Sequence, residues 1–332
     1  MSPRIGFFTR LLEDAPAAER YHFALEQIEH AERLGFSTAW IAQHHFDAAE
    51  GGLPSPFLLL AAAAERTSRI RLGTGVVTLA HENAVRTAED AAVLDLLSGG
   101  RVELGVGTGA SPESLELFGF GGRDRNDLFA EKLARLREAL AGRPLDESGR
   151  HLQPAAPTLP GRIWQATLSP SGARRAGRAG DGLMLSRTQV RETGQTLDDV
   201  QLPIIDEYLR ALPEGVEPRI LASRTLVVVD EENRAAALRH AEERVRSLAR
   251  GFLRSPEASA GDLDELFALT NTCFGTVPEV VDRLGADATA ARADEVSFQV
   301  HSIDPGHELA LRSLELIATE VAPQLGWGGA GA

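Results

Sequence analysis

The sequence predicts a single (β/α)8 barrel, an α/β fold in which eight parallel strands alternate with helices. Short apolar runs rich in β-branched residues alternate with longer amphipathic stretches along the 332 residues of the chain. Eight such apolar runs are present. Eight strands that alternate with helices over about 300 residues fit a closed barrel better than an open sheet.

The expected elements follow from these runs in chain order. The strands span residues 4–9, 38–42, 70–78, 101–108, 162–167, 182–186, 220–229 and 295–301. Helices are expected at about 18–34, 56–67, 84–98, 170–179, 197–212, 231–250, 277–286 and 306–322, where the apolar residues recur with helical period.

Two segments depart from the short connections of such a barrel. Residues 140–160 contain four Pro and are expected to form an irregular surface excursion. Residues 252–275 contain the turn-prone stretch SPEASAGD, and a connection of this length is expected to act as an inserted lid or binding loop. No linker separates domains, so residues 1–325 are predicted to form one domain and the Gly/Ala-rich residues 326–332 a flexible tail.

Composition and charge exclude several classes of function. The net charge of -14 would repel nucleic acid and anionic membranes, and the longest apolar run, residues 58–64, is too short to span a bilayer. The single cysteine, Cys273, excludes an intramolecular disulfide and a cysteine-based metal cluster. A strand-like run begins almost at once, without a leader of signal-peptide type, so a cytoplasmic protein with a small-molecule ligand or a protein partner is expected.

Active residues of a barrel project from the carboxyl ends of its strands. That rule selects Phe7, Phe8, Thr9, Gln43, His44, His45, Thr74, Gly75, Val76, Gly107, Thr108, Gly109, Ala166, Thr167, Ser186, Arg187 and His301. The set has no paired carboxylates, which argues against two-carboxylate hydrolysis. A metal on His44 and His301 is disfavoured, because the nearest acidic residue, Asp47, lies in a loop.

The stretch AWIAQHHF, residues 39–46, places two adjacent histidines at the end of a strand. Adjacent strand residues point to opposite sides, so at least one imidazole of His44 and His45 is expected to face a site. The alternative is that one ring caps the strand end through a backbone hydrogen bond while the other is solvated.

Two further stretches are suited to a cofactor. Glycines in Gly105–Gly109 would let a flat ring system approach the backbone, although they could also serve close packing of helices. Ser169 and Pro170 are typical of a helix start. Ser171 and the N–H groups of Gly172 and Ala173 would then form a phosphate site at a helix N-terminus, with Ser169 acting as a purely structural cap as the alternative.

Taken together, these motifs resemble the bacterial luciferase-like, flavin-dependent monooxygenases. The resemblance rests on AWIAQHHF, RTSRIRLGTGVVTL and RTAEDAAVLDLLSGGRVELGVGTG, followed by WQATLSPSGARRAGRAGDGLMLS, FGTVPEVVDRL and EVSFQVHSIDPGHELALRSLELIATEVAPQL, and it covers residues 1–325. It implies a (β/α)8 barrel, reduced FMN as cosubstrate and transfer of one atom of O2 to an organic substrate.

The resemblance also implies roles for individual residues. His44 matches the histidine that supports oxygen chemistry at the flavin and acts in proton transfer, and residues 252–275 correspond to a mobile lid. Thr74 and Gly75 match the strand end under the flavin ring, often with a non-proline cis peptide. The remaining cofactor-binding positions that it implies are Phe8, Gly107, Thr108, Gly109, Ser169, Ser171 and Gly172.

Three departures from the family pattern matter. Gln43 replaces a usual Glu, which removes a negative charge and is expected to leave His44 more neutral at pH 7. Thr108 stands where many members carry a phosphate-binding Arg, so Arg123 or Arg125 is expected to supply that charge. No cysteine lies near the flavin on the fourth strand, so light emission is not expected.

The leading hypothesis is a two-component monooxygenase that is supplied with reduced FMN by a separate flavin reductase, because no second nucleotide-binding domain is evident. Hydride transfer with a deazaflavin and without O2 is the alternative, and a non-catalytic flavin-binding protein is a third. The intact His44 and the full-length lid region argue against the third. A homodimer is expected through the Ala-rich helices at 56–67 and 84–98.

Overall fold

The fold is described from a computed structural model, which covers residues 2–48, 50–109, 112–189, 191–192, 194–253, 261–300 and 305–328. Eight parallel strands form a closed ring, because β10 pairs with β1 on one side and with β8 on the other. The ring consists of β1 (Arg4–Thr9), β2 (Thr38–Ile41), β3 (Arg71–Thr74), β5 (Val102–Gly107), β6 (Ile163–Thr167), β7 (Gly182–Leu185), β8 (Ile220–Val228) and β10 (Glu295–Gln299). The predicted barrel is thereby confirmed.

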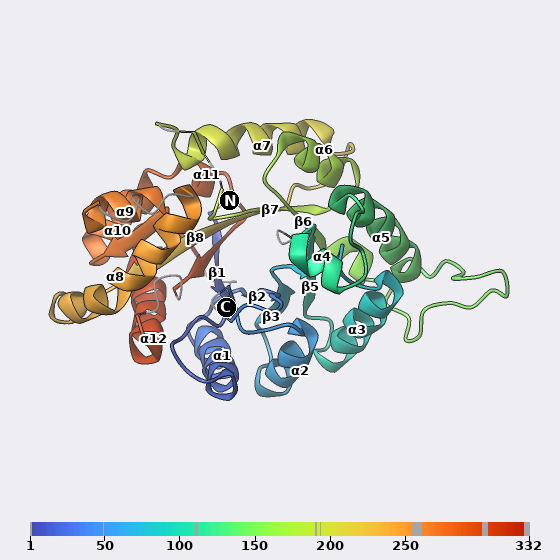
Figure 1. Cartoon of the computed structure of the whole chain (residues 1–332), viewed down its shortest axis with the longest axis horizontal. Coiled ribbons are helices and arrows are strands. Elements are labelled where there is room, and N and C mark those ends of the chain that lie inside the picture. Colours follow the sequence, from blue (N-terminus) through green and yellow to red (C-terminus); the bar gives the residue numbers. More distant parts are fainter. Residues whose placement is uncertain are drawn as a thin grey trace.

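Helices surround the ring, as Figure 1 shows. They are α1 (Ala17–Arg33), α2 (Pro56–Arg66), α3 (Ala84–Leu97), α5 (Arg125–Leu140), α6 (Pro170–Arg178), α7 (Leu197–Ala211), α8 (Glu231–Leu253), α10 (Val277–Gly285) and α12 (His307–Leu316). Short helices α4 (Pro112–Leu117), α9 (Leu263–Leu269), α11 (Ala288–Ala291) and α13 (Ala322–Gln324), a 3-10 turn (Leu159–Arg162) and a π-helical turn (Ile317–Val321) complete the helical elements. In the described part of the chain, none of these helices is both long and apolar enough to cross a membrane.

Local sequence signals explain where these helices begin. Asn83 and Asp124 accept hydrogen bonds from the first backbone N–H groups of α3 and α5. Thr196 and Asp199 form a reciprocal capping box at the start of α7. These caps fix where the helices begin, and the apolar faces of the helices pack on the strands.

The interior of the barrel is filled by large side chains that lie over glycines. Trp40 packs against Gly73, and Trp164 against Gly182, where an added Cβ would clash with the indole ring. The two indoles meet edge to face, with ring centroids 5.6 Å apart. The interior is therefore a packed core and no pore passes through it.

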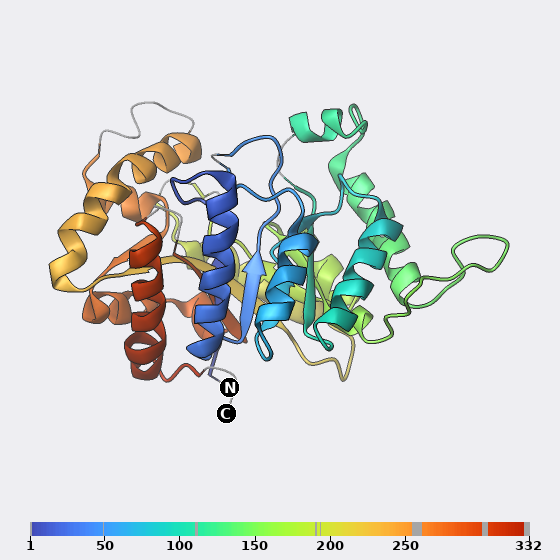
Figure 2. The same cartoon turned by 90° about the horizontal axis from the view of Figure 1, so that it is seen from below.

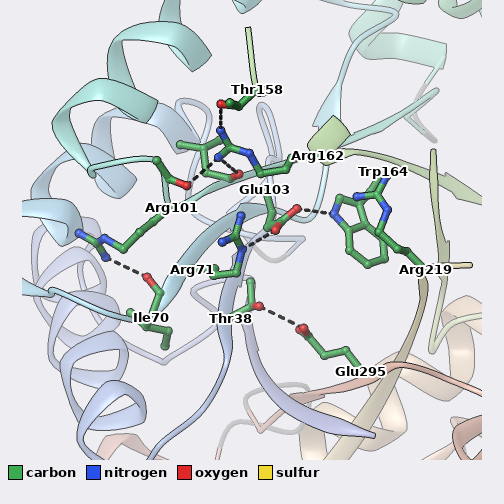
Figure 3. A network of polar contacts seen from close by, with 12 residues as sticks. Thr38, Ile70, Arg71, Arg101, Glu103, Thr158, Arg162, Trp164, Arg219 and Glu295 are labelled. Atoms are coloured by element: carbon green, nitrogen blue, oxygen red, sulfur yellow. Dashed lines mark hydrogen bonds and ion pairs between the residues drawn. The ribbon is translucent and has the colours of Figure 1, made fainter. Parts of the chain in front are cut away.

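Polar side chains close the N-terminal end of this interior (Figure 3). The Nε1 of Trp164 donates to Glu103 at 2.7 Å, and the Nε1 of Trp40 donates to Glu295 at 2.7 Å. Glu103 also pairs with Arg71. Burial raises the pKa of Glu295, and the hydrogen bond from Trp40 opposes that shift.

The structure differs from the predicted elements in several places. The strand expected at 70–78 is interrupted, and its second part forms β4 (Val77–Thr78), which pairs with β5. The predicted lid at 252–275 contains helix α9 and a strand, β9 (Thr272–Gly275), that pairs with β8; residues 254–260 lie outside the described residues. No helix was expected at α5.

Two further predictions concern the excursion after α5 and the C-terminal tail. The expected excursion after α5 contains no helix or strand before Leu159, and the green loop at the right of Figures 1 and 2 shows it projecting from the barrel. Of the predicted tail, the structure describes residues 326–328: Gly328 forms a β-bridge with Arg4 of β1, and Trp327 stacks with Phe298 of β10. Figure 2 shows both termini at the end opposite the carboxyl ends of the strands.

Candidate active site at the carboxyl end of the barrel

An apolar platform lies where the strands end. Phe8, Val76 and Ala166 are half-buried and rest on the cluster of Trp40 and Trp164 below them. Two glycines allow these side chains to lie flat. A Cβ at Gly75 would be 2.8 Å from Phe8, and a Cβ at Gly107 would be 2.8 Å from Val76. The platform can thus accept a planar ring system from above.

The peptide bond between Gly75 and Val76 is cis, at the position where the family resemblance implies a non-proline cis peptide. Thr74 is fully buried, and its hydroxyl donates to the Gly105 carbonyl at 2.7 Å. The side chain of Thr74 therefore joins two strands, which leaves the Gly75 backbone as the part of this pair that faces the platform.

Thr108 and Gly109 follow β5 beside the platform. Gly109 has φ of +72° and lies against His81, and the Arg125 guanidinium donates to its carbonyl at 3.2 Å. Arg123 instead forms an ion pair with Glu131 at 2.7 Å. Of the two arginines expected to replace the missing phosphate ligand, Arg125 is the one that lies beside the predicted cofactor segment.

Helix α6 begins as predicted, with Ser169 as its N-cap. The Ser169 hydroxyl accepts a hydrogen bond from Gly172 N–H at 3.2 Å and lies 3.1 Å from the Ser171 hydroxyl. The Ala173 N–H donates to the Ser169 carbonyl. The N–H groups of Gly172 and Ala173, which the sequence assigned to an anion, are therefore already bonded. The exposed Ser171 hydroxyl is the group that is left to face an anion.

A shallow, open groove of about 410 Å³ runs along α6 from Ser171 to the C-cap Ala179 and is lined by three arginines, Arg174, Arg175 and Arg178. Arg174 pairs with Glu207 at 2.9 Å, whereas Arg175 is bonded to the neutral Gln165. Sequence reasoning missed these arginines. The signal was their spacing after Ser171, because residues three, four and seven positions apart share one face of a helix.

His44 lies after β2 and packs against the segment at Gly51. A Cβ at Gly51 would be 2.7 Å from His44 Nδ1, which is buried and has no hydrogen-bond partner among the described residues. Burial, and then the charges of Arg10, Arg187 and His45, lower the pKa of His44 to about 3. Its imidazole is therefore neutral at pH 7 and has an acceptor nitrogen available.

Gln43 has a different role from the one expected. Its Oε1 accepts from the backbone and hydroxyl of Thr78, at 2.7 and 2.8 Å, and its Nε2 donates to Glu82 at 2.7 Å. Glu82 thus brings a carboxylate to the amide that replaces the family's Glu. Burial and the charges of Arg10, Arg187 and His45 keep His44 neutral, and within the described residues no carboxylate is among the groups that act on its pKa.

His45 occupies a separate aromatic cluster. Its ring centroid lies 4.8 Å from that of Phe118 and 6.1 Å from that of His81, and Phe118 stacks on His81 at 5.6 Å. Burial lowers the pKa of His81 to about 4. The two neighbouring histidines, His44 and His45, therefore have different surroundings, and sequence reasoning did not identify His81 or Phe118.

The described residues contain no group of three or more His, Cys, Asp or Glu side chains that could hold a metal ion. His301, weighed as a metal ligand, lies outside the described residues. Cys273 is half-buried on β9, and burial raises the pKa of its thiol to about 11.

Comparison with known proteins points to one family. The sequence matches the family described as Luciferase-like monooxygenase over residues 4–295. The 4-hydroxyprotoasukamycin monooxygenase of Streptomyces nodosus subsp. asukaensis is 31% identical over 325 residues, covering 90% of this chain and 85% of that protein. The crystal structure of monooxygenase RslO1 from Streptomyces bottropensis aligns with a TM-score of 0.78 and 25% identity, over 97% of this chain and 99% of that one.

Other relatives differ in their cofactor. The oxygenating constituent of 3,6-diketocamphane monooxygenase from Pseudomonas putida, solved in complex with FMN, has a TM-score of 0.75 at 20% identity and covers 98% of both chains, which shows a shared fold. An F420-dependent glucose-6-phosphate dehydrogenase of Amycolatopsis mediterranei is 31% identical over 209 residues, covering 58% of this chain and 61% of that protein.

Proposed function

Because the chain belongs to the luciferase-like monooxygenase family and is a flavin-type oxidoreductase, we propose that it uses reduced FMN and O2 to oxygenate a small organic substrate. A separate flavin reductase would supply the reduced FMN. The observation that carries this proposal is the joint presence of a flat apolar platform and, at the start of α6, a hydroxyl pair beside an arginine-lined groove.

The residues present suit FMN in their chemistry. The apolar side chains of Phe8, Val76 and Ala166 suit a flat ring system, and Gly75 and Gly107 carry no side chain that would stand in its way. Ser171, near the start of α6, and the nearby Arg174 and Arg175 suit a phosphate, because hydroxyl donors and cations bind anions. When bound, reduced flavin supplies the two electrons with which O2 is activated.

His44 is the group to which the family resemblance assigns proton transfer, and we propose that role for it here. Its ring is neutral at pH 7, and one of its two nitrogens, set by the tautomer, is an acceptor. A bound cofactor and substrate would have to raise its low pKa for the ring to take up a proton. The half-buried platform and the aromatic cluster of His45, His81 and Phe118 would exclude water from the opening, as oxygen chemistry requires.

The second candidate is hydride transfer with a deazaflavin, and the deazaflavin-dependent relative favours it. Both cofactors place a phosphate and a planar ring at such a site. An anaerobic titration with FMN and with the deazaflavin, followed by a pulse of oxygen, separates the two. Tighter binding of the deazaflavin, or electron transfer that is insensitive to oxygen, would overturn the FMN proposal.

The phosphate site is tested with the double variant Ser169→Ala/Ser171→Ala. Hydrogen bonds to a charged group contribute about 1.5–3 kcal/mol each, so FMN affinity should fall by about tenfold or more. Riboflavin, which lacks the phosphate, should bind as before. Thr196→Ala removes the cap of α7 and serves as a control for loss of a helix cap alone. Equal losses for FMN and riboflavin would place the phosphate elsewhere.

A homodimer is proposed through α2 and α3, which pack side by side (Figure 1). Leu58 on α2 and Val93, Leu96 and Leu97 on α3 are exposed, and an unpartnered apolar surface of this kind suits a second copy of the chain. Sedimentation that gives a monomer at micromolar concentration would refute this interface.

A further inference from the structure

Arg187 is a buried cation at the carboxyl end of the barrel that the proposed function has not yet used. It follows β7, and only 5% of its surface is exposed. Its Nε donates to Gln299 at 2.6 Å and its Nη1 donates to Thr225 at 3.1 Å. Both partners are neutral, and within the described part of the chain no carboxylate is bonded to this guanidinium.

The surroundings of Arg187 add positive charge. Arg10, at the end of β1, is also largely buried, and it pairs with Glu50 at 2.8 Å. Arg10 Nε has no partner among the described residues. The Glu50 side chain is 66% exposed, and among the described residues it forms an ion pair with Arg10 and none with Arg187. Burial, and then the charge of Arg10, lower the pKa of Arg187, which shows how poorly this charge is compensated.

The side-chain amide of Gln299 is a second buried group whose hydrogen bonds are incomplete among the described residues. It is fully buried at the end of β10, where it pairs in register with Phe8 of the platform and with Thr225 of β8. Its Oε1 accepts from Arg187, but its Nε2 has no hydrogen-bond partner among the described residues. A buried donor without a partner costs about 1–3 kcal/mol, so an arrangement of this kind indicates a ligand acceptor.

These donors lie beside the platform. Arg187 follows β7, whereas Thr225 lies on β8 and Gln299 on β10, and these three strands are neighbours in the ring. Gln299 pairs in register with Phe8, so the donors adjoin the β1 side of the platform, whereas the start of α6, with its hydroxyl pair, follows β6. A substrate group bound there would lie next to a ring system on the platform.

We propose that Arg187 and the Gln299 amide bind an anionic group of the substrate, of the carboxylate class, so that the enzyme oxygenates an organic acid. This inference rests on the proposed oxygenase function. Guanidinium and amide N–H groups are suited to a carboxylate, which accepts two parallel hydrogen bonds. The ring of reduced flavin, an anion near neutral pH, has the same chemistry and is the alternative that the experiment must exclude.

The test compares matched acids and amides on the full-length protein without flavin. Benzoate with benzamide, and decanoate with decanamide, are titrated at constant ionic strength by calorimetry. The wild type should bind at least one acid about tenfold or more tightly than its amide. Arg187→Gln should abolish that preference and leave amide binding unchanged. Arg187→Lys, which keeps the charge, should retain part of it. Arg86→Gln, on the exposed face of α3, is the matched control.

Measurements of stability and of flavin binding distinguish substrate binding by Arg187 from a structural role and from a flavin-binding role. Replacing a buried, uncompensated charge should leave the unfolding midpoint of Arg187→Gln equal to that of the wild type or higher. A lower midpoint together with an unchanged acid preference would show a structural role and overturn the proposal. If Arg187→Gln lowers the affinity for reduced FMN and leaves the binding of acids unchanged, Arg187 binds the flavin. This result would also overturn the proposal. If the wild type prefers acids to amides but does not bind FMN, the proposed function is refuted, whereas the inferred carboxylate site is not.

Discussion

The two ends of the barrel differ in whether their buried polar groups have hydrogen-bond partners. At the N-terminal end, Glu103 is bonded to the indole of Trp164 and pairs with Arg71, as Figure 3 shows. Glu295 is bonded to the indole of Trp40 and pairs with Arg4. At the carboxyl end, buried atoms of Arg10, His44 and Gln299 lack partners among the described residues. The hydroxyls of Ser223 and Ser297, in the middle of the interior, also have no hydrogen-bond partner within the part of the chain that the structure describes.

This difference indicates what the polar groups of each end do. Bonds between buried groups that satisfy each other stabilise the fold itself, as expected for the N-terminal face of a barrel. Buried groups that the chain leaves unsatisfied lower its stability unless a ligand completes them. The carboxyl end therefore has the features of a binding site, and substitutions at the two ends should separate stability from activity.

The largest effect is expected at the carboxyl end, for His44→Ala. A general acid–base group contributes about 10²–10⁴-fold, so product formed per reduced FMN consumed should fall by a factor in that range, while hydrogen peroxide release rises. FMN affinity should remain nearly intact, because the ring of His44 is neutral. The measurement is product and peroxide in turnover with a substrate of the wild type.

His45→Ala is the matched control for that experiment. His45 lies in the cluster with His81 and Phe118 and not against Gly51, so its removal should disturb coupling less. If both variants uncouple equally, or if His45 alone matters, the assignment of His44 as the proton-transfer group is wrong.

The next largest effect is expected at the N-terminal end, for Glu295→Ala. This change leaves the buried Trp40 N–H without its acceptor, so the free energy of unfolding should fall by about 1–3 kcal/mol. The lost contact with Arg4 should add little, because the Arg4 side chain is 43% exposed. Glu295→Gln keeps an acceptor for Trp40 and should lose less. Chemical denaturation measures both variants. FMN affinity of the folded variants should be unchanged, and a parallel loss of affinity would contradict the separation of the two ends.

Much of this organisation could be predicted from the sequence, because period and caps are local signals. The eight strands of the ring and the start of α6 at Ser169 follow from such signals. The sequence also contains a local signal for helix α5. Its buried residues recur with helical period after the cap Asp124, at Leu128, Leu133, Leu136 and Leu140. Strand β9 has four residues and owes its identity to pairing with β8, so no local signal defines it.

The site was less accessible to sequence reasoning for the same physical reason. His44 and Ser171 were identified because strand ends and helix starts are visible in the chain. The charge balance around Arg187 depends on residues from β1, β8 and β10, and Arg10 pairs with Glu50 across 40 positions. Interactions between residues so distant in sequence arise only after the barrel closes.

The smallest expected effect concerns acid stability and the variant His81→Phe. The folded protein holds His81 neutral down to about pH 4, whereas an unfolded histidine takes up a proton near pH 6.5. The unfolded state therefore binds more protons in this window, and stability falls as the pH decreases from 6.5 to 4, at about 1.4 kcal/mol per pH unit for each such histidine. His44 contributes in the same direction.

Phenylalanine at this position removes one titrating group and keeps the stacking on Phe118. Both ring nitrogens of His81 lack partners among the described residues, so the apolar ring should cost little at pH 7. Denaturation curves between pH 4 and 7 should show a slope that is shallower by about 1.4 kcal/mol per pH unit. His81→Gln should give the same slope at lower overall stability, because it buries an amide. An unchanged slope in both variants would mean that the pKa of His81 is the same in the folded and the unfolded protein. The polar groups at the carboxyl end would then be better satisfied than the comparison of the two ends implies.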